Sequence, residues 1–251
     1  MSTVSGHTEA QQAAIWHDVE CGSYEADLSL WRSLAADNPG RVLELGTGTG
    51  RVALDLARRG TSVVALDFDQ QLIDALGERA AGLPLEAVAG DMIDFDLSER
   101  FSLVLAPMQV MQLLAAADRP ACFERVRAHL EPGGAFAVAI VEGAPPAAQA
   151  PEHGPIGTLP DIVDREGWVY SSLPLGVAID GETMVVQRLR QIVSPDGELT
   201  ESESTDRLAL LDAETIESEA RACGLLPAKR YEVAATDAHI ASMVLLLEAT
   251  R

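Results

Sequence analysis

Between residues 41 and 141, five short apolar runs alternate with stretches of helical periodicity. The runs are RVLELG (41–46), SVVALD (62–67), LEAVAG (85–90), FSLVLA (101–106) and AFAVAIV (135–141). The helical stretches end at Arg59, span 69–81 and span 119–130. Strands that are apolar throughout are buried on both faces, and strands separated by helices pair in parallel through right-handed crossovers. The pattern therefore predicts an α/β fold with a Rossmann-like, doubly wound sheet.

The flanking segments add further elements. Ahead of the first run, apolar residues at helical spacing predict a helix over 24–36 with Ser23 as its N-cap. Residues 142–160 hold five prolines and three glycines, which indicates a linker. Two turn signals then separate three strands of an antiparallel meander, at 167–179, 183–194 and 200–210. A helix over 213–223, capped by Asp212, and two strands near 228–233 and 240–249 complete the pattern.

The chain is strongly acidic, with 18 Lys and Arg residues against 39 Asp and Glu residues and a formal net charge of −21. Such a surface repels phosphate backbones, so we expect no nucleic-acid partner. The three cysteines are far apart and form no CxxC pair, which favours a reducing compartment and no metal site. Neither a signal peptide nor an apolar run long enough to cross a bilayer is found, so we expect a soluble, cytoplasmic protein without a membrane partner.

The first apolar run leads into a glycine-spaced turn, LELGTGTGR (43–51), which a helix follows. Gly46, Gly48 and Gly50 let the backbone bend sharply and approach a ligand closely. The dinucleotide fingerprint G-x-G-x-x-G would need its third glycine at Arg51. Pyrophosphate binding is therefore disfavoured, and an NAD(P)-dependent oxidoreductase is the weaker alternative.

Two acidic positions accompany this turn. Asp67 ends the second run, where a carboxylate can accept both hydroxyls of a ribose. Asp91 and Met92 follow the third run, where the carboxylate can accept an adenine amine and the thioether can lie against the ring. Both positions are at carboxyl ends of predicted strands, the edge at which open α/β sheets bind ligands. Either aspartate could instead be a helix N-cap.

Five segments together resemble class I S-adenosylmethionine-dependent methyltransferases of the small-molecule type. The segments are VLELGTGTGRVALDLA, VVALDFD, GDMIDFDL, FSLVLAPMQVMQLL and HLEPGGAFAVAI, within about residues 20–142. The resemblance implies a seven-stranded sheet whose last strand is antiparallel, with an antiparallel β insertion after strand five. Two positions depart from the family pattern: Ser102 replaces a usual acidic residue, and 106–109 lacks the Asn-Pro-Pro-aromatic signature of methylation on base amino groups.

The resemblance also implies S-adenosylmethionine as the cofactor and assigns residues to it. Glu44 would orient the turn and meet the methionine amino group, Asp67 would hold the ribose, and Phe68 would pack on adenine. An aromatic residue near the N-terminus would close over the methionine end. The complete implied set is Tyr24, Glu44, Gly46, Thr47, Gly48, Asp67, Phe68, Asp91, Met92 and Pro107.

No fixed catalytic side chain is demanded, because a sulfonium methyl group is already activated. Alignment alone can supply on the order of 7–11 kcal/mol. A general base adds roughly 10²–10⁴-fold where one is needed. His239 is the first candidate, since imidazole exchanges protons near neutral pH, and His153 in the linker is a weaker one. Either could be an ordinary loop histidine.

The substrate-side candidates come from the ends of strands four and five and from the meander. They are Gln109, Gln112, Glu142, Trp168 and Tyr170. Gln112 could instead be a satisfied buried polar group. Trp168 and Tyr170 share one face of a strand and could instead form the core of the meander or a dimer contact.

The sequence thus predicts a methyltransferase that transfers a methyl group from S-adenosylmethionine to oxygen, nitrogen or carbon of a small molecule. A non-catalytic protein that binds the cofactor remains an alternative. We expect one domain with an N-terminal helical cap (1–40), a cofactor-binding core (41–142), a linker and β-meander over the substrate (143–211), and a C-terminal helix and hairpin (212–251). A homodimer would form through the β insertion.

Overall fold

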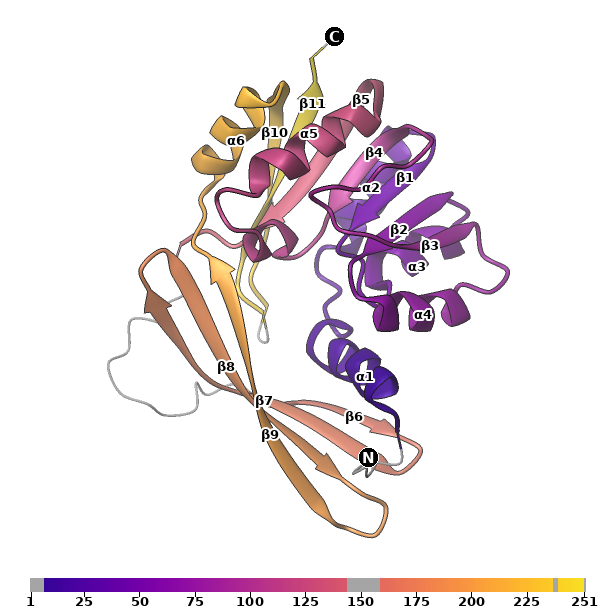
Figure 1. Ribbon diagram of the computed structural model, residues 1–251, viewed down its shortest axis with the longest axis vertical. Coiled ribbons are helices and arrows are strands. Elements are labelled where there is room, and N and C mark those ends of the chain that lie inside the picture. The colour runs from indigo at the N-terminus through magenta and orange to yellow at the C-terminus, as the bar shows by residue number, and fades with distance from the viewer. Residues whose placement is uncertain (1–6, 144–158, 237–238, 251) are drawn as a thin grey trace. The chain divides into compact units, whose positions relative to one another are not determined.

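The computed structural model describes residues 7–143, 159–236 and 239–250 (Figure 1). The chain forms two compact units. One contains residues 1–24 and 144–210, and the other contains residues 25–143 and 211–251. The segment 1–40, expected to be a single cap, is therefore divided between the two units.

The larger unit is built on a seven-stranded sheet in the order β10-β11-β5-β4-β1-β2-β3. Strands β1 to β5 are parallel, and β11 is antiparallel to both of its neighbours. The strands are β1 (Val42–Leu45), β2 (Val63–Asp67), β3 (Leu85–Ala89), β4 (Phe101–Ala106), β5 (Leu130–Ile140), β10 (Leu225–Val233) and β11 (Ser242–Ala249). The predicted seven-stranded sheet with an antiparallel last strand is confirmed.

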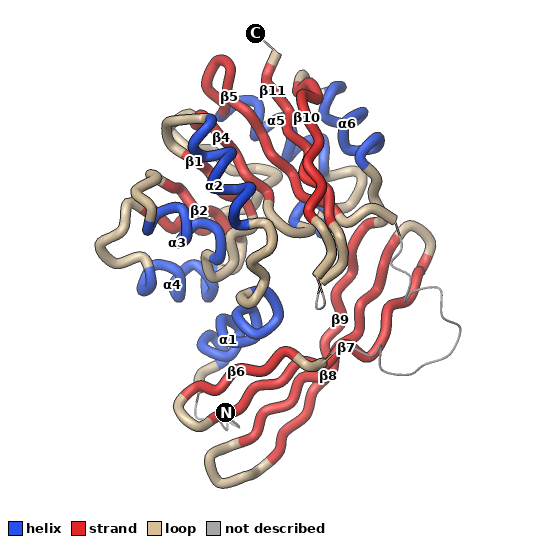
Figure 2. The backbone as a smooth tube through the Cα atoms, turned by 180° about the vertical axis from the view of Figure 1, so that it is seen from behind, coloured by secondary structure: helices blue, strands red, loops and turns tan. Residues whose placement is uncertain are grey.

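Helices cover both faces of this sheet. They are α2 (Leu28–Asp37), α3 (Arg51–Arg58), α4 (Gln70–Arg79), the short 3₁₀ helix η1 (Val110–Leu113), α5 (Arg119–His129) and α6 (Ala213–Ala222). The views from the two sides show α2 and α3 on one face and α5 and α6 on the other (Figures 1 and 2). Every residue of β1, β2 and β4 is buried, as expected for strands covered on two faces. The sheet is doubly wound, as predicted.

The N-terminal helix starts later than predicted. The prediction of a helix over 24–36 with Ser23 as its N-cap is wrong, because α2 begins at Leu28 and Asp27 is the residue before it. Residues ahead of Leu28 turn instead: the Leu28 amide donates to the Glu25 carbonyl. The Asp27 carboxylate accepts from Trp31 Nε1 at 2.7 Å, which secures the first turn of α2 in place of a cap.

The smaller unit packs a helix on an antiparallel meander. Helix α1 (Glu9–Cys21), which the sequence pattern did not predict, begins with a capping box between Thr8 and Gln11. The meander has four strands where three were predicted: β6 (Asp161–Arg165), β7 (Trp168–Asp180), β8 (Thr183–Val193) and β9 (Leu199–Ala209). Its core comprises Ile15, Trp16, Val19, Tyr170 and Ile192, with Val163 and Trp168 against them.

Polar contacts also join α1 to the meander. Glu20 accepts two hydrogen bonds from Arg190, at 2.7 and 2.8 Å, and a third from the Ser172 hydroxyl at 2.9 Å. Burial acts to raise the pKa of the Glu20 carboxyl, but these bonds and the charge of Arg190 hold it below its usual range. The ionised Glu20 carboxylate therefore has hydrogen-bond partners in the folded unit.

Among the described residues, no helix is long and apolar enough to cross a membrane.

We expect Trp16→Ala to lower the free energy of unfolding by about 3–5 kcal/mol, because it empties a buried aromatic site. Urea denaturation measures the change. Leu199→Ala is the control, since Leu199 is exposed on β9 and its loss should cost less than about 0.5 kcal/mol. Equal effects of the two substitutions would contradict the packing of α1 on the meander.

Candidate functional site

The turn after β1 has a left-handed backbone that leaves no room for side chains. Gly46, Gly48 and Gly50 have φ angles of 61°, 55° and 91°. A Cβ atom on Gly46 would lie 2.7 Å from Cγ1 of Val110, the first residue of η1. A Cβ on Gly50 would collide with Leu76 of α4. Gly46 and Gly50 are therefore required by packing as well as by backbone conformation, and Gly48 by its backbone conformation.

Glu44 and Thr47 place polar atoms without partners at this turn. Glu44 is 2% exposed, and its Oε2 has no hydrogen-bond partner; the buried Thr47 hydroxyl has none either. Burial raises the pKa of the Glu44 carboxyl to about 8, while the charge of Arg51 acts in the opposite direction. Buried polar atoms are nearly always paired, so these two indicate a ligand that donates hydrogen bonds.

Asp67 connects the glycine turn to the end of β2. Its Oδ2 accepts from the Gly48 amide at 2.8 Å, and its Oδ1 accepts from the Asp69 amide at 3.0 Å. The residue is 6% exposed. Asp67 is not a helix cap, because Asp69 caps α4 by accepting from the Gln71 amide. A carboxylate has further lone pairs, so Asp67 keeps acceptor capacity for hydroxyl groups.

An apolar surface lies next to this carboxylate. Phe68 is 75% exposed, an unusual state for a phenyl ring that directly follows a buried strand. At the end of β3, Asp91 is exposed and its Oδ1 accepts from the Ile93 amide at 3.1 Å, while Met92 is buried. β2 and β3 are paired neighbours in the sheet, so their carboxyl ends share one edge. This edge can receive a flat heterocycle beside an acceptor.

The segment after β4 contains backbone strain that the sequence did not reveal. Met108 has a φ of 55°, which is uncommon for a residue with a side chain and recurs at functional sites. Pro107 before it is buried and Gln109 after it is half-buried. Gln112 in η1 is satisfied internally, because its side chain accepts from the Val141 amide at 2.8 Å and donates to the Val141 carbonyl at 3.3 Å. The geometry therefore favours the structural alternative for Gln112.

The other substrate-side candidates have structural partners. Glu142 accepts from the Ala213 amide at 2.9 Å and so contacts the first turn of α6. Tyr170 is fully buried in the core of the smaller unit and Trp168 packs there as well. The geometry favours the alternative that these two rings form the core of the meander, because α1 packs on this face. Tyr24 is buried and belongs to the same unit, and its closure over a cofactor stays a prediction.

Of the two histidine candidates, His239 lies within the described residues. His239 is half-buried after β10, and its amide donates to the Thr236 hydroxyl at 3.0 Å. Its Nδ1 lies 3.4 Å from the same hydroxyl. His153 lies outside the described residues. A further histidine, His129, has a structural role, because its Nε2 accepts from the Leu97 amide at 2.9 Å. A catalytic role for His239 stays a prediction.

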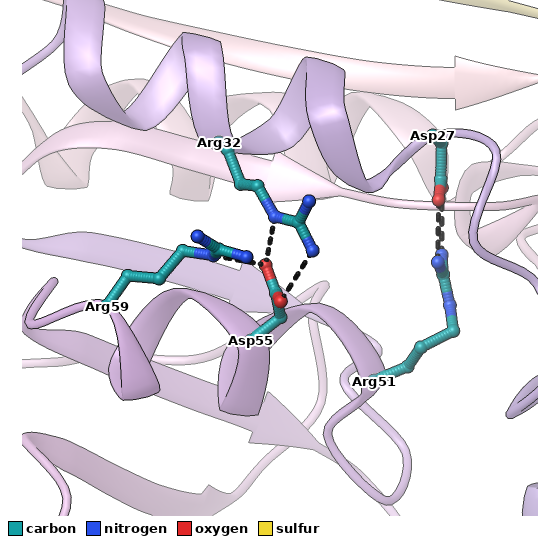
Figure 3. Close-up of polar contacts among 5 residues, drawn as sticks. All are labelled: Asp27, Arg32, Arg51, Asp55 and Arg59. Carbon is teal, nitrogen blue, oxygen red and sulfur yellow. Dashed lines mark hydrogen bonds and ion pairs between the residues drawn. The ribbon is translucent and has the colours of Figure 1, made fainter.

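Two ion pairs join α2 and the residue before it to α3, and neither was predicted (Figure 3). Asp27 accepts hydrogen bonds from both terminal nitrogens of Arg51, at 2.6 and 2.8 Å. The Arg51 and Asp27 side chains are only 9% and 3% exposed. Arg32 makes an equivalent two-point contact with Asp55, at 2.7 and 2.8 Å, but is more exposed. Sequence spacing shows no link between 27 and 51; only the crossing of α2 over α3 brings them together.

The residues at this edge fit S-adenosylmethionine. Glu44 Oε2 and the Thr47 hydroxyl offer unused acceptors for an ammonium group, Asp67 offers a carboxylate for ribose, and the exposed Phe68 ring offers a surface for adenine. The geometry therefore agrees with the cofactor set that the sequence resemblance implied, and each of those contacts remains a proposal.

Comparisons with known proteins give the same classification. Residues 42–134 match the family model of a methyltransferase domain. The chain is 34% identical to the cypemycin N-terminal methyltransferase of a Streptomyces species over 112 residues, which is 44% of this chain and 46% of that protein. It is 29% identical to a tRNA1(Val) (adenine(37)-N6)-methyltransferase of Bacteroides thetaiotaomicron over 120 residues, 43% of this chain and 50% of that protein. The chain thus spans about half the length of these relatives.

A solved structure is similar over almost the whole chain. CalS10 of Micromonospora echinaspora, an amino pentose methyltransferase with S-adenosylmethionine bound, aligns with a TM-score of 0.70 and 20% identity. The alignment covers 97% of this chain and 98% of CalS10. The chain therefore has the class I methyltransferase fold, with the antiparallel insertion after strand five, and the resemblance found in the sequence is confirmed.

We expect Gly46→Ala to destabilise the larger unit by about 1–3 kcal/mol through the clash with Val110, in addition to the cost of its left-handed backbone. Gly60→Ala is the matched control, because Gly60 has a φ of 91° and open space around its Cβ position. Its expected cost is about 1 kcal/mol, the backbone contribution alone. Chemical unfolding of both variants measures the difference, and equal losses would contradict the close packing of η1 on the turn.

Proposed function

We propose that this protein binds S-adenosylmethionine and transfers its methyl group to a small molecule. The observation that carries the proposal is the buried, unpartnered Oε2 of Glu44 beside the glycine turn, at the same sheet edge as Asp67 and the exposed Phe68. An adenosyl amino acid has an ammonium group, a ribose and an adenine that match these three positions. A dinucleotide would present a pyrophosphate where the turn places a buried carboxyl.

When bound, S-adenosylmethionine supplies a methyl group on a positively charged sulfur, which is reactive toward nucleophiles. The protein's own residues hold the two ends: Glu44 and Thr47 take the amino acid end, and Asp67 takes the ribose. Fixing both ends points the reactive carbon in one direction, and alignment of this kind supplies on the order of 7–11 kcal/mol. No side chain has to form a covalent intermediate.

We propose a nitrogen atom of a small molecule as the acceptor. Support comes from the names of similar proteins, an amino pentose methyltransferase and an N-terminal methyltransferase of the peptide cypemycin. A similar protein acts on tRNA, but a net charge of −21 opposes binding of an RNA backbone. A screen of small amines against matched alcohols, read by mass spectrometry as addition of one methyl group, tests the assignment.

The compartment and assembly belong to the same proposal. The three cysteines are free thiols, which fits the reducing cytoplasm where S-adenosylmethionine is made. Exposed apolar side chains stand singly on the meander, at Ile162, Ile179 and Leu199, and a homodimer through this sheet would cover them. Sedimentation of the purified protein tests that assembly.

We expect Asp67→Asn to weaken binding of S-adenosylhomocysteine by about 10–150-fold, the equivalent of the 1.5–3 kcal/mol that hydrogen bonds to a charged group contribute. Isothermal titration measures the affinity. Asp69→Asn is the matched control, because asparagine retains the cap of α4. Unchanged affinity in Asp67→Asn would remove the ribose assignment. Binding of NADH in place of S-adenosylhomocysteine would replace the whole proposal with the oxidoreductase alternative.

If His239 acts as the general base, His239→Ala should lower the rate of methyl transfer roughly 10²–10⁴-fold and abolish the acidic limb of the pH–rate profile. Thr236→Val is the control, since it removes the hydroxyl that contacts the His239 amide and keeps the imidazole. A pH–rate profile that is identical in His239→Ala and the unmodified protein would exclude His239 as the base.

A further inference from the structure

Arg51 occupies a position where a cation is locally unfavourable. It is the first residue of α3, directly after the left-handed Gly50, and the amino end of a helix carries a partial positive charge. No acidic residue stands in the first turn of α3 to offset that charge. Sequences that break a local rule in this way do so at functional or strained sites. Arg51 therefore needs an explanation beyond the stability of α3.

A buried ion pair stands at this helix end and acts electrostatically on the buried Glu44. Asp27 holds the Arg51 guanidinium through two hydrogen bonds, and Arg51 acts electrostatically on Glu44. The side chains of Arg51 and Asp27 are 9% and 3% exposed. With Glu44 protonated, the trio has no net charge. With Glu44 ionised, it carries one negative charge, and a bound ammonium group restores neutrality.

The groups around Glu44 are few. Burial raises the pKa of its carboxyl most; Asp27 raises it further, and Arg51 from α3 lowers it. The Ala53 amide also lowers it. From β2, Asp67 directs its oxygens to the Gly48 and Asp69 amides, and β4 carries no titratable side chain. Arg51 is thus the cation that opposes burial at Glu44.

We propose that Arg51, anchored by Asp27, is a positioning residue that lets the buried Glu44 exchange its proton for the ammonium group of the cofactor's methionine. This rests on the proposed function. In the exchange, the Glu44 O–H bond breaks, its proton leaves to solvent, and an N–H of the ammonium group donates to the carboxylate. Without Arg51, burial would hold Glu44 neutral and its O–H would face the ammonium. Arg51 thereby makes the affinity for the cofactor depend on pH, although Arg51 need not contact the cofactor.

The sign of the coupling follows from the two states of Glu44. With a pKa near 8 in the unliganded protein, most Glu44 is protonated at pH 7, so binding of a cation releases about one proton. Affinity should then rise about tenfold per pH unit between pH 6 and 7.5 and level off above pH 8. Arg51→Gln removes the opposing charge, so the same rise should shift to higher pH and affinity at pH 7 should fall at least about tenfold.

The test is titration of the full chain with S-adenosylhomocysteine at several pH values, in two buffers of different ionisation enthalpy. Release of about one proton at pH 7 by the unmodified protein supports the proposal; release of none overturns it without any variant. Arg51→Gln should shift the rise of affinity with pH to higher pH, and Arg51→Lys should restore its position. Glu44→Gln should abolish the pH dependence of the affinity. Arg32→Gln is the matched control, because it breaks the equivalent α2–α3 pair with Asp55 and should leave the profile in place.

The outcomes separate two failures. Binding with an unchanged profile in Arg51→Gln would reduce Arg51 to a structural ion pair and leave the proposed function intact. No binding of S-adenosylhomocysteine by the unmodified protein at any pH would overturn the proposed function itself. Urea denaturation of each variant distinguishes loss of the fold from loss of the coupling.

Discussion

The close approach of η1 to the glycine turn is the constraint on which the site depends. Val110 occupies the space where a side chain at Gly46 would lie, and Leu76 does the same at Gly50. The turn is therefore held from two sides by apolar packing, although its own backbone is left-handed at three positions. In this packed turn the Gly48 amide donates to Asp67, and the carboxyl of Glu44 is buried.

That rigidity explains why an uncompensated acid is tolerated in the core. A buried carboxyl without full pairing is costly, and such a cost persists where a site is prepared for a ligand. Two effects reduce the cost: the raised pKa lets the buried Glu44 stay neutral, and the charge of Arg51 favours its ionised form. Asp27 in turn satisfies Arg51 and binds Trp31, so one carboxylate organises both the start of α2 and the electrostatics of the turn.

The sheet and the acids at its carboxyl edge were predictable because they depend on local patterns. Apolar runs locate β1 to β4 to within a residue, and acids at the run ends identify Asp67 and Asp91. What escaped prediction depends on tertiary contacts. The pairing of Asp27 with Arg51 joins residues with no sequence relation, and the left-handed Met108 follows from packing after β4. Helix α1 escaped because its apolar face is complete only with Tyr170 and Ile192 beside it, although the Thr8–Gln11 capping box was a readable signal.

The smaller unit is assembled from two segments that are far apart along the chain. Ile15, Trp16 and Val19 are synthesised first, but the strands that cover them begin only at Asp161. At about 5–20 residues per second, a ribosome needs on the order of 7–28 seconds to supply the roughly 140 intervening residues. During that interval α1 presents an uncovered aromatic and aliphatic face, while the parallel strands of the larger unit are already emerging. The order of synthesis therefore makes α1 the element most in need of protection by a chaperone in a newly made chain.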